Sequence, residues 1–281
     1  MKKLLLNIIL LFFFITAFSQ KDTLMELNFN STIIGERTRE LNNEFSLLRN
    51  LNYKPSSKKK SSALPFFDDF SQVYHYPNPE KWEDKNVWVN NNFPVNPISY
   101  GVATFDGLDS TGYPYNFINP TAKGVADYLT TQPIDLSSIT DSVYLSFFYQ
   151  PQGNGNKPET EDSLRLEFFN PSDSSWTRKW AIVGSASVPF QQVMVPVDTT
   201  YHKNNFKFRF VNYATLSGNV DHWNLDYIYL NDQRSYTDTA LYDVALTLTD
   251  LNLLKDYSRM LWSHYMVVPT VNMASLPVVE Y

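Results

Sequence analysis

Acidic side chains are the residues of this sequence most able to do chemistry, because several stand where predicted strands end or turn. Carboxylates in such places can surround a hard cation such as calcium, which takes about six to eight oxygen ligands. Asp also caps turns, since its side chain bonds to the nearby backbone. Both interpretations stay open for a set that comprises Asp68, Asp69, Asp106, Asp109, Asp162, Asp221 and Asp226.

A second acidic group, Glu159, Glu161 and Asp162, follows a loop rich in Gly and Asn. Paired carboxylates hydrolyse glycosides when they flank a cleft, and a solvated loop accounts for the same residues. His222 next to Asp221 could be a base with its orienting acid, or a loop histidine at a strand entry. The chain has no cysteine, which excludes thiol nucleophiles and cysteine metal sites. No catalytic residue is assigned.

Aromatic residues make up 16% of the chain and suit two roles. In a core they fill the space between sheets, which is the role expected of Trp82 and Trp88. On a surface their flat apolar faces complement the C–H face of a sugar ring. We expect a ligand-binding role for four of them: Tyr113 and Tyr115 in a Gly-Tyr-Pro-Tyr loop, with Trp176 and Trp180.

The elements that would position these residues are strands. From residue 64 to 232, short runs alternate apolar and polar residues, as in Phe206-Lys-Phe-Arg-Phe210 and Leu164-Arg-Leu-Glu-Phe168. A period of two places one face of a strand on a core and the other toward water. The runs predict an all-β fold over 64–232, an antiparallel two-sheet β-sandwich of the jelly-roll type with about eight to ten strands.

The flanking segments have other patterns. Residues 1–19 read as a signal peptide, with Lys2 and Lys3 before an apolar run and cleavage expected near Ser19. Residues 20–63 should hold a short amphipathic helix over 37–52, with Leu41, Phe45, Leu48 and Leu51 on one stripe, and a polar linker. Residues 233–281 read as a linker and the start of a further, truncated β domain, with strands over 238–249 and from Met266. No transmembrane segment is expected in the mature chain.

Several short motifs resemble known families. Phe66-Phe-Asp-Asp-Phe70, Asp162-Ser-Leu-Arg-Leu166 and Asp221-His-Trp-Asn-Leu-Asp-Tyr-Ile-Tyr-Leu230 look like the strands of MAM-type, lectin-like jelly rolls. The cysteine pairs of animal MAM domains are missing, so this resemblance is architectural. In such jelly rolls a calcium ion commonly lies near the first and closing strands. The resemblance therefore implies Ca²⁺ as a structural cofactor, with Asp69 and Asp226 as candidate metal ligands.

The signal ending Phe18-Ser-Gln20, with Leu64-Pro-Phe-Phe-Asp-Asp-Phe70 and Gly101-Val-Ala-Thr-Phe-Asp-Gly107, resembles surface proteins of Bacteroidota exported by the type IX secretion system. The resemblance implies a Gram-negative cell-surface or secreted location and contact with the secretion machinery during export.

The function expected from these patterns is a non-catalytic, secreted or cell-surface β-sandwich module for adhesion or for binding glycan or protein ligands. Two alternatives stay open, an accessory domain of a secreted hydrolase and a structural component of the type IX secretion or gliding machinery. A net charge of −6 argues against a nucleic-acid partner.

Overall fold

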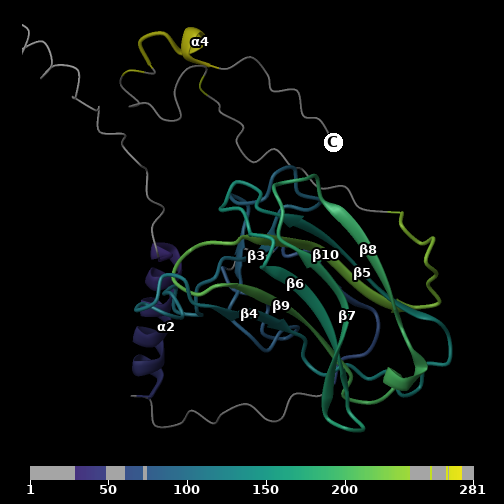
Figure 1. Ribbon diagram of the computed structural model, residues 1–281. Coiled ribbons are helices and arrows are strands. Elements are labelled where there is room, and N and C mark those ends of the chain that lie inside the picture. Colours follow the sequence, from purple (N-terminus) through teal and green to yellow (C-terminus); the bar gives the residue numbers. More distant parts are fainter. Residues whose placement is uncertain are drawn as a thin grey trace, which may run out of the picture.

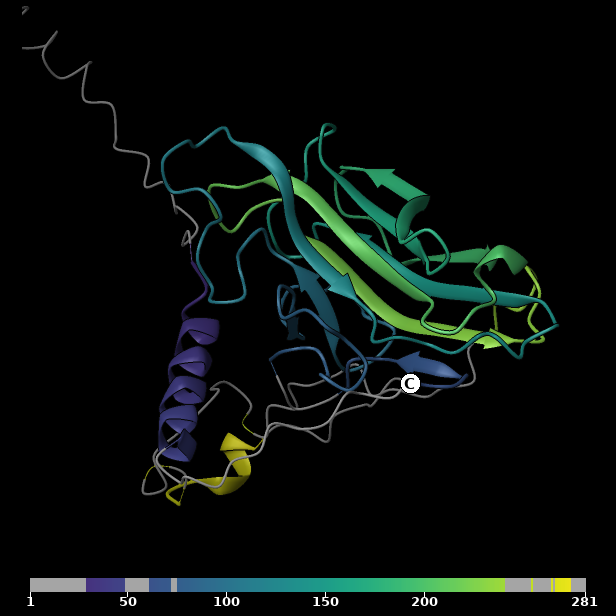
Figure 2. The same ribbon diagram turned by 90° about the horizontal axis from the view of Figure 1, so that it is seen from below.

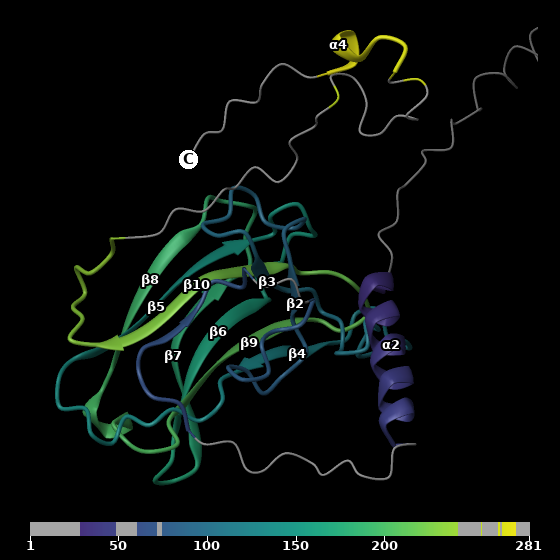
Figure 3. The ribbon, with the colours of Figure 1, turned by 180° about the vertical axis from the view of Figure 1, so that it is seen from behind.

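The computed structural model of the protein describes residues 29–48, 61–71, 75–240, 254, 264 and 266–273, with the side chains of 43–48 left aside. Within these residues two antiparallel sheets pack into a sandwich, and one helix, α2 (Ser31–Leu48), lies beside it on the side of β4 (Figures 1 and 3). The fold class predicted from the sequence is therefore confirmed. The two sheets contain ten strands, six in one and four in the other, as the alternating runs predict.

The six-stranded sheet has the order β2-β3-β10-β5-β8, with β1 also paired to β10. Its strands are β1 (Phe66–Asp68), β2 (Trp88–Asn90), β3 (Val102–Phe105), β5 (Val143–Pro151), β8 (Gln191–Val197) and β10 (Trp223–Asp232). The four-stranded sheet, β4-β9-β6-β7, consists of β4 (Lys123–Thr130), β6 (Ser163–Asn170), β7 (Ser175–Val183) and β9 (Lys207–Thr215). A short 3-10 helix, η1 (Thr199–Tyr201), joins β8 to β9.

The core lies between the sheets and uses the alternating positions. Phe206, Phe208 and Phe210 are fully buried, as are Leu164, Leu166 and Phe168 of the neighbouring strand. Trp82 is buried among them, edge-on to Phe66 and Phe208, and its indole N–H donates to the carboxylate of Asp68 at 2.6 Å. Because successive residues of a strand point to opposite faces, the residues between these core positions lie on the two outer faces of the sandwich.

Helix α2 differs from its prediction. It begins at Ser31, six residues before the predicted start, because the side chain of Asn30 accepts hydrogen bonds from the backbone N–H groups of Thr32 and Ile33 and caps the first turn. Ile33 is only 4% exposed, and Glu40 pairs with Lys85 at 3.1 Å, whereas Leu41 of the predicted stripe is 39% exposed. Figure 2 shows α2 beside the sandwich in the view from below.

The ends of the chain are described only in part. The signal peptide 1–19, most of the linker and all but the first three residues of the strand expected over 238–249 lie outside the described residues. Residues 269–272, where a strand was expected, form the short helix α4 (Pro269–Asn272), with Pro269 in its first turn. None of the described helices is long and apolar enough to cross a membrane.

Candidate functional site

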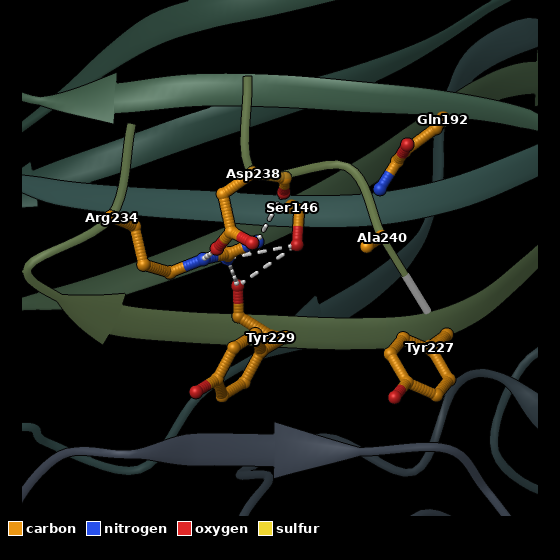
Figure 4. Close-up of a pocket in the computed structure, with 7 residues that line it drawn as sticks. All are labelled: Ser146, Gln192, Tyr227, Tyr229, Arg234, Asp238 and Ala240. Carbon is orange, nitrogen blue, oxygen red and sulfur yellow. Dashed lines mark hydrogen bonds and ion pairs between the residues drawn. The ribbon is translucent and has the colours of Figure 1, made fainter. Parts of the chain in front are cut away.

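A pocket of about 280 Å³ lies on the outer face of the six-stranded sheet. Its floor consists of outward side chains from three adjacent strands, Ser146 of β5, Gln192 of β8, and Tyr227 and Tyr229 of β10. Figure 4 shows the two tyrosines side by side along β10, with Gln192 across from them. They share a face, since both rings lie edge-on to Phe67 of the neighbouring β1, with ring centroids 4.9 and 6.0 Å away.

The wall of the pocket is the segment 233–240, which leaves β10 and turns back over the sheet (Figure 4). Arg234 holds this segment down. Its guanidinium lies 4.5 Å from the centroid of the Tyr229 ring, and it donates to the Ser146 hydroxyl and to the Tyr229 carbonyl oxygen, each at 2.9 Å. Asp238 pairs with the same guanidinium at 2.6 Å. Because the buried charge is paired and hydrogen-bonded, the pocket has an electrically neutral wall with polar groups at its rim.

The two tyrosines predicted as ligand-binding residues lie in another loop, away from this pocket. Tyr113 is 41% exposed, and its ring lies 6.2 Å from that of Phe117. Tyr115 points inward, and its hydroxyl donates to the buried carboxylate of Asp127 at 3.1 Å. Burial and this neighbouring acid raise the pKa of the Tyr115 phenol above its usual value.

The two tryptophans predicted as ligand-binding residues lie on opposite faces of β7. Trp180 packs on the core side, edge-on to Phe147 at 5.2 Å. Trp176 lies on the outer face, where the guanidinium of Arg209 stacks 4.1 Å from its centroid. Residues four apart on a regular strand share a face, but β7 has a bulge, since Leu166 pairs with Trp180 while Glu167 pairs with Arg178. The extra residue in β7 shifts the alternation of side chains by one position, so Trp176 and Trp180 on either side of the bulge point to opposite faces of the sheet.

The two candidate metal ligands, Asp69 and Asp226, both contact the hydroxyl group of Ser99. One Asp226 oxygen accepts the backbone N–H groups of Ile98 and Ser99, and the other lies 2.5 Å from the Ser99 hydroxyl. The same hydroxyl lies 2.6 Å from the carbonyl oxygen of Asp69 and 3.0 Å from that of Gly101. The carboxylate of Asp69 itself accepts bonds from Ser71.

The oxygens around the Ser99 hydroxyl are the Asp226 carboxylate and the carbonyls of Asp69 and Gly101. The Ser99 hydroxyl has a single proton and three oxygen acceptors around it, so it can donate a full hydrogen bond to only one of them. Burial raises the pKa of Asp226 to about 7. Carboxylate, carbonyl and hydroxyl oxygens are the ligands that calcium prefers. The structure places the Asp69 carbonyl, rather than its carboxylate, next to Asp226.

A second acidic cluster, Glu159, Asp162 and Asp221, could hold a metal, since one oxygen of each lies within 4.8 Å of the others. Lys123 already counters its charge, with its ammonium 2.9 Å from Asp162 and 3.8 Å from Glu159. Burial, and then the hydrogen bond and charge of Asp162 and Asp221, raise the pKa of Glu159. These acids include two of the three considered for glycoside hydrolysis, and the third, Glu161, also approaches Lys123 at 3.9 Å.

His222 is buried, and its ring is hydrogen-bonded to residues of the neighbouring loops. Its ring accepts the backbone N–H of Asn156 and faces the side-chain oxygen of Asn219, both at 2.9 Å. Burial lowers its pKa to about 4. Asp221 next to it accepts the N–H of Thr215 instead, so the two do not form the base and orienting acid considered from the sequence.

The site residues that the sequence did not single out are those of the pocket. Tyr227 and Tyr229 alternate with the buried Ile228 and Leu230, so their outward position followed from the pattern. Nothing in the sequence placed Arg234 over them, because that contact depends on the path of the chain after the last strand.

The class of protein that this geometry defines is a two-sheet antiparallel β-sandwich with a walled pocket on one outer face. No protein-family model matches the sequence, and no curated protein matches it. Solved structures of similar fold include the K1 cleaved adhesin domain of Lys-gingipain from Porphyromonas gingivalis W83, at 12% identity and a TM-score of 0.39, covering 61% of this chain and 99% of that one.

Two carbohydrate-binding modules are also similar. The CBM22-1 xylan-binding domain of Paenibacillus barcinonensis Xyn10C matches at 7% identity and a TM-score of 0.34, over 63% of this chain and 99% of its own. A point mutant of the family 29 module CBM29-2 matches at 7% identity and a TM-score of 0.31, over 59% and 92%. These likenesses concern the sandwich fold alone, and the assignment of a site in this chain depends on its own residues.

Proposed function

We propose that this protein is a non-catalytic module that binds a neutral glycan in the pocket walled by residues 233–240. The observation that supports this most is the lining, an aromatic floor with a rim of amide and carboxylate groups. A sugar presents an apolar C–H face and a ring of hydroxyl groups. Tyr227 complements the first, and the side chains of Gln192 and Asp238 complement the second.

The size of the pocket also favours this ligand. At about 280 Å³ it is smaller than most pockets for drug-sized ligands, which span roughly 300–1,000 Å³. It suits one sugar unit, with the rest of a chain lying along the sheet. Because the buried charge of Arg234 is paired with Asp238, an uncharged ligand meets no unpaired charge there.

The test is binding of the full mature chain to an array of neutral oligosaccharides, followed by calorimetry of the best ligand. Replacing Gln192→Ala should weaken binding about tenfold, the value of one good hydrogen bond. Gln191→Ala is the matched control, because adjacent residues of a strand face opposite sides, and it should leave the affinity unchanged. Absence of binding to every neutral glycan, or equal affinity of the two variants, would contradict the proposal.

We also propose a structural calcium ion at Asp226, with the carbonyl oxygens of Asp69 and Gly101 and the Ser99 hydroxyl as further ligands. The ion would supply the positive charge that these oxygens lack, and this chain's residues would hold the loop 98–101 against β10 and β1. At a calcium concentration 100-fold above its dissociation constant, the folded protein gains about 2.7 kcal/mol. Thermal unfolding in calcium and in chelator measures this gain. Asp226→Asn should abolish it and Asp162→Asn should not, whereas the reverse pattern would place the ion in the second acidic cluster.

The location of the protein is a proposal that depends on sequence features alone. We propose export after cleavage near Ser19 and, from the resemblance given above, passage through the type IX secretion machinery to the outer surface of a Gram-negative cell. N-terminal sequencing of the protein from the outer-membrane and medium fractions should begin at Gln20. A cytoplasmic protein that keeps its first nineteen residues would contradict it.

A further inference from the structure

The outer face of the four-stranded sheet is basic, although the chain as a whole has a net charge of −6. Charged residues occupy five outward positions of β6, β7 and β9, and four of them are basic: Arg165, Arg178, Lys207 and Arg209, with Glu167 as the acid. A second acid, Glu83 from the segment before β2, pairs with Lys207 at 3.1 Å. Such a local excess of one sign on an acidic protein attracts ligands of the opposite sign.

Aromatic rings hold these cations in place. The guanidinium of Arg209 lies between Trp176, at 4.1 Å from the ring centroid, and Tyr128, at 5.0 Å. Arg165 lies 4.9 Å from the ring of Tyr213. Lys207 lies 5.4 Å from the ring of Phe169. A cationic side chain that is stacked on a ring is already restricted in its conformation. Less side-chain entropy is therefore lost when a ligand binds to it.

The sheet arranges two of the guanidinium groups in one row. Arg178 of β7 and Arg209 of β9 both pair in register with Glu167 of the strand between them. Their backbones are therefore two strand spacings apart, roughly 10 Å. Arg209 forms an ion pair with Glu167 at 2.7 Å, while Arg178 is exposed and forms no salt bridge with the residues that the structure describes.

We propose that this face is a second binding surface, which takes a polysaccharide chain bearing carboxylate or sulfate groups. A polymer with one anionic group in each repeat can reach both guanidinium groups of the row at once, and arginine binds carboxylate and sulfate oxygens through two parallel hydrogen bonds. The surface is on the opposite side of the sandwich from the neutral pocket, and it does not depend on that pocket.

A nucleic acid is the other polyanion to consider, and the ring contacts argue against it. Single strands bind proteins by stacking their bases on aromatic faces beside a basic groove. Here the rings of Trp176, Tyr128 and Tyr213 already have a guanidinium over them. The surface thus presents fixed charges rather than open stacking platforms, which suits anionic sugars.

The experiment compares four probes on the full mature chain: polygalacturonate for carboxylates, chondroitin sulfate for sulfates, cellohexaose as a neutral sugar and poly-dT as a nucleic acid. We expect at least one of the two acidic polysaccharides to bind, with an affinity that falls steeply between about 0.05 and 0.5 M salt because the contacts are ionic. Whichever acidic probe binds identifies the anionic group. Poly-dT binding as tightly as both, or binding that salt does not weaken, would overturn the proposal.

Two variants make the test specific. Arg178→Gln should weaken binding of the acidic polysaccharide about tenfold. Arg39→Gln should not, because Arg39 is an exposed arginine of α2 and does not belong to the strands that form this face. Glu167→Gln removes the acid that lies between Arg178 and Arg209 and keeps an acceptor for Arg209, so it should tighten binding about threefold, an effect that misfolding cannot imitate. Unchanged affinity in both Arg178→Gln and Glu167→Gln would refute the surface, and the neutral-glycan pocket would be unaffected by that result.

Discussion

Two buried carboxyl groups make the stability of this protein depend on pH in a direction that can be measured. Asp106, which follows β3, and Asp127 of β4 are both shielded from solvent, and the side chain of Asn30, which caps α2, bonds to Asp106. Burial raises the pKa of both carboxyl groups. The charge of Asp127 raises that of Asp106 further. Two such groups cannot both ionise cheaply, so the folded protein keeps a proton that the unfolded chain releases near pH 4.

The sign follows from the raised pKa values. The stabilisation is complete below the unfolded pKa of about 3.9 and is lost as the pH rises through the folded values. One retained proton changes the free energy of unfolding by about 1.4 kcal/mol per pH unit, or about 3 kcal/mol between pH 5 and pH 7.

Asp127→Asn tests this reasoning. The amide oxygen can still accept from the backbone N–H of Gly107 and the side chain of Asn212, which bond to one Asp127 oxygen at 3.0 Å each. The variant lacks the Asp127 carboxyl, whose pKa burial raises to about 7, and it also lacks the charge next to Asp106. It should therefore lose about 3 kcal/mol less than the wild type between pH 5 and pH 7. Urea unfolding followed by tryptophan fluorescence, with chelator present, measures both slopes.

Comparing the wild type with Asp127→Asn isolates the contribution of Asp106 and Asp127, because the other titrating groups are the same in both proteins. Asp226 has a raised pKa and His222 a lowered one, and both contributions cancel in the difference. Asp135→Asn is the matched control, since this exposed acid has a pKa lowered by hydrogen bonds from Ser137. Parallel slopes for the wild type and Asp127→Asn would refute the shared-proton argument.

Three further outcomes are expected from the contacts. Trp180→Ala should reduce the free energy of unfolding by about 3 kcal/mol because its ring packs on the core. Trp176→Ala should reduce it by less than about 1 kcal/mol because that ring lies on the outer face. Chemical denaturation measures both values. Asn30→Ala should cost about 1 kcal/mol of helix-capping energy, seen as faster proteolysis within α2. Arg234→Met should free the segment after β10 by removing its bonds to Ser146 and Asp238, which limited proteolysis at 233–240 detects; equal digestion of variant and wild type would contradict it.

The strands were predictable because their signal is local. Phe206, Phe208 and Phe210 alternate with Lys207 and Arg209, and the structure buries the first three and turns the charged two outward as a period of two requires. The buried Ile228 and Leu230 follow the same alternation. The start of α2 was missed, although Asn30 is a good helix cap, because residues 31–36 lack an apolar stripe.

For the candidate ligand-binding and metal sites, the sequence predicted the types of residue but not their positions. The sequence called for aromatic and acidic residues at loops and strand ends, but a single bulge in β7 sends Trp180 to the core and leaves Trp176 outside. Asp69 and Asp226 were expected to meet as two carboxylates. The Ser99 hydroxyl joins the carboxylate of one to the backbone carbonyl of the other instead.

The sequence by itself thus determined which residues form strands and which of their faces is buried, since these depend on neighbours within a few positions along the chain. Only the tertiary structure decided which distant groups meet. Arg234 reaches Ser146 across 88 residues, and Asp127 reaches Asn212 across 85. Such contacts depend on strand order, on bulges and on the path of the chain after its last strand, and no local periodicity encodes them.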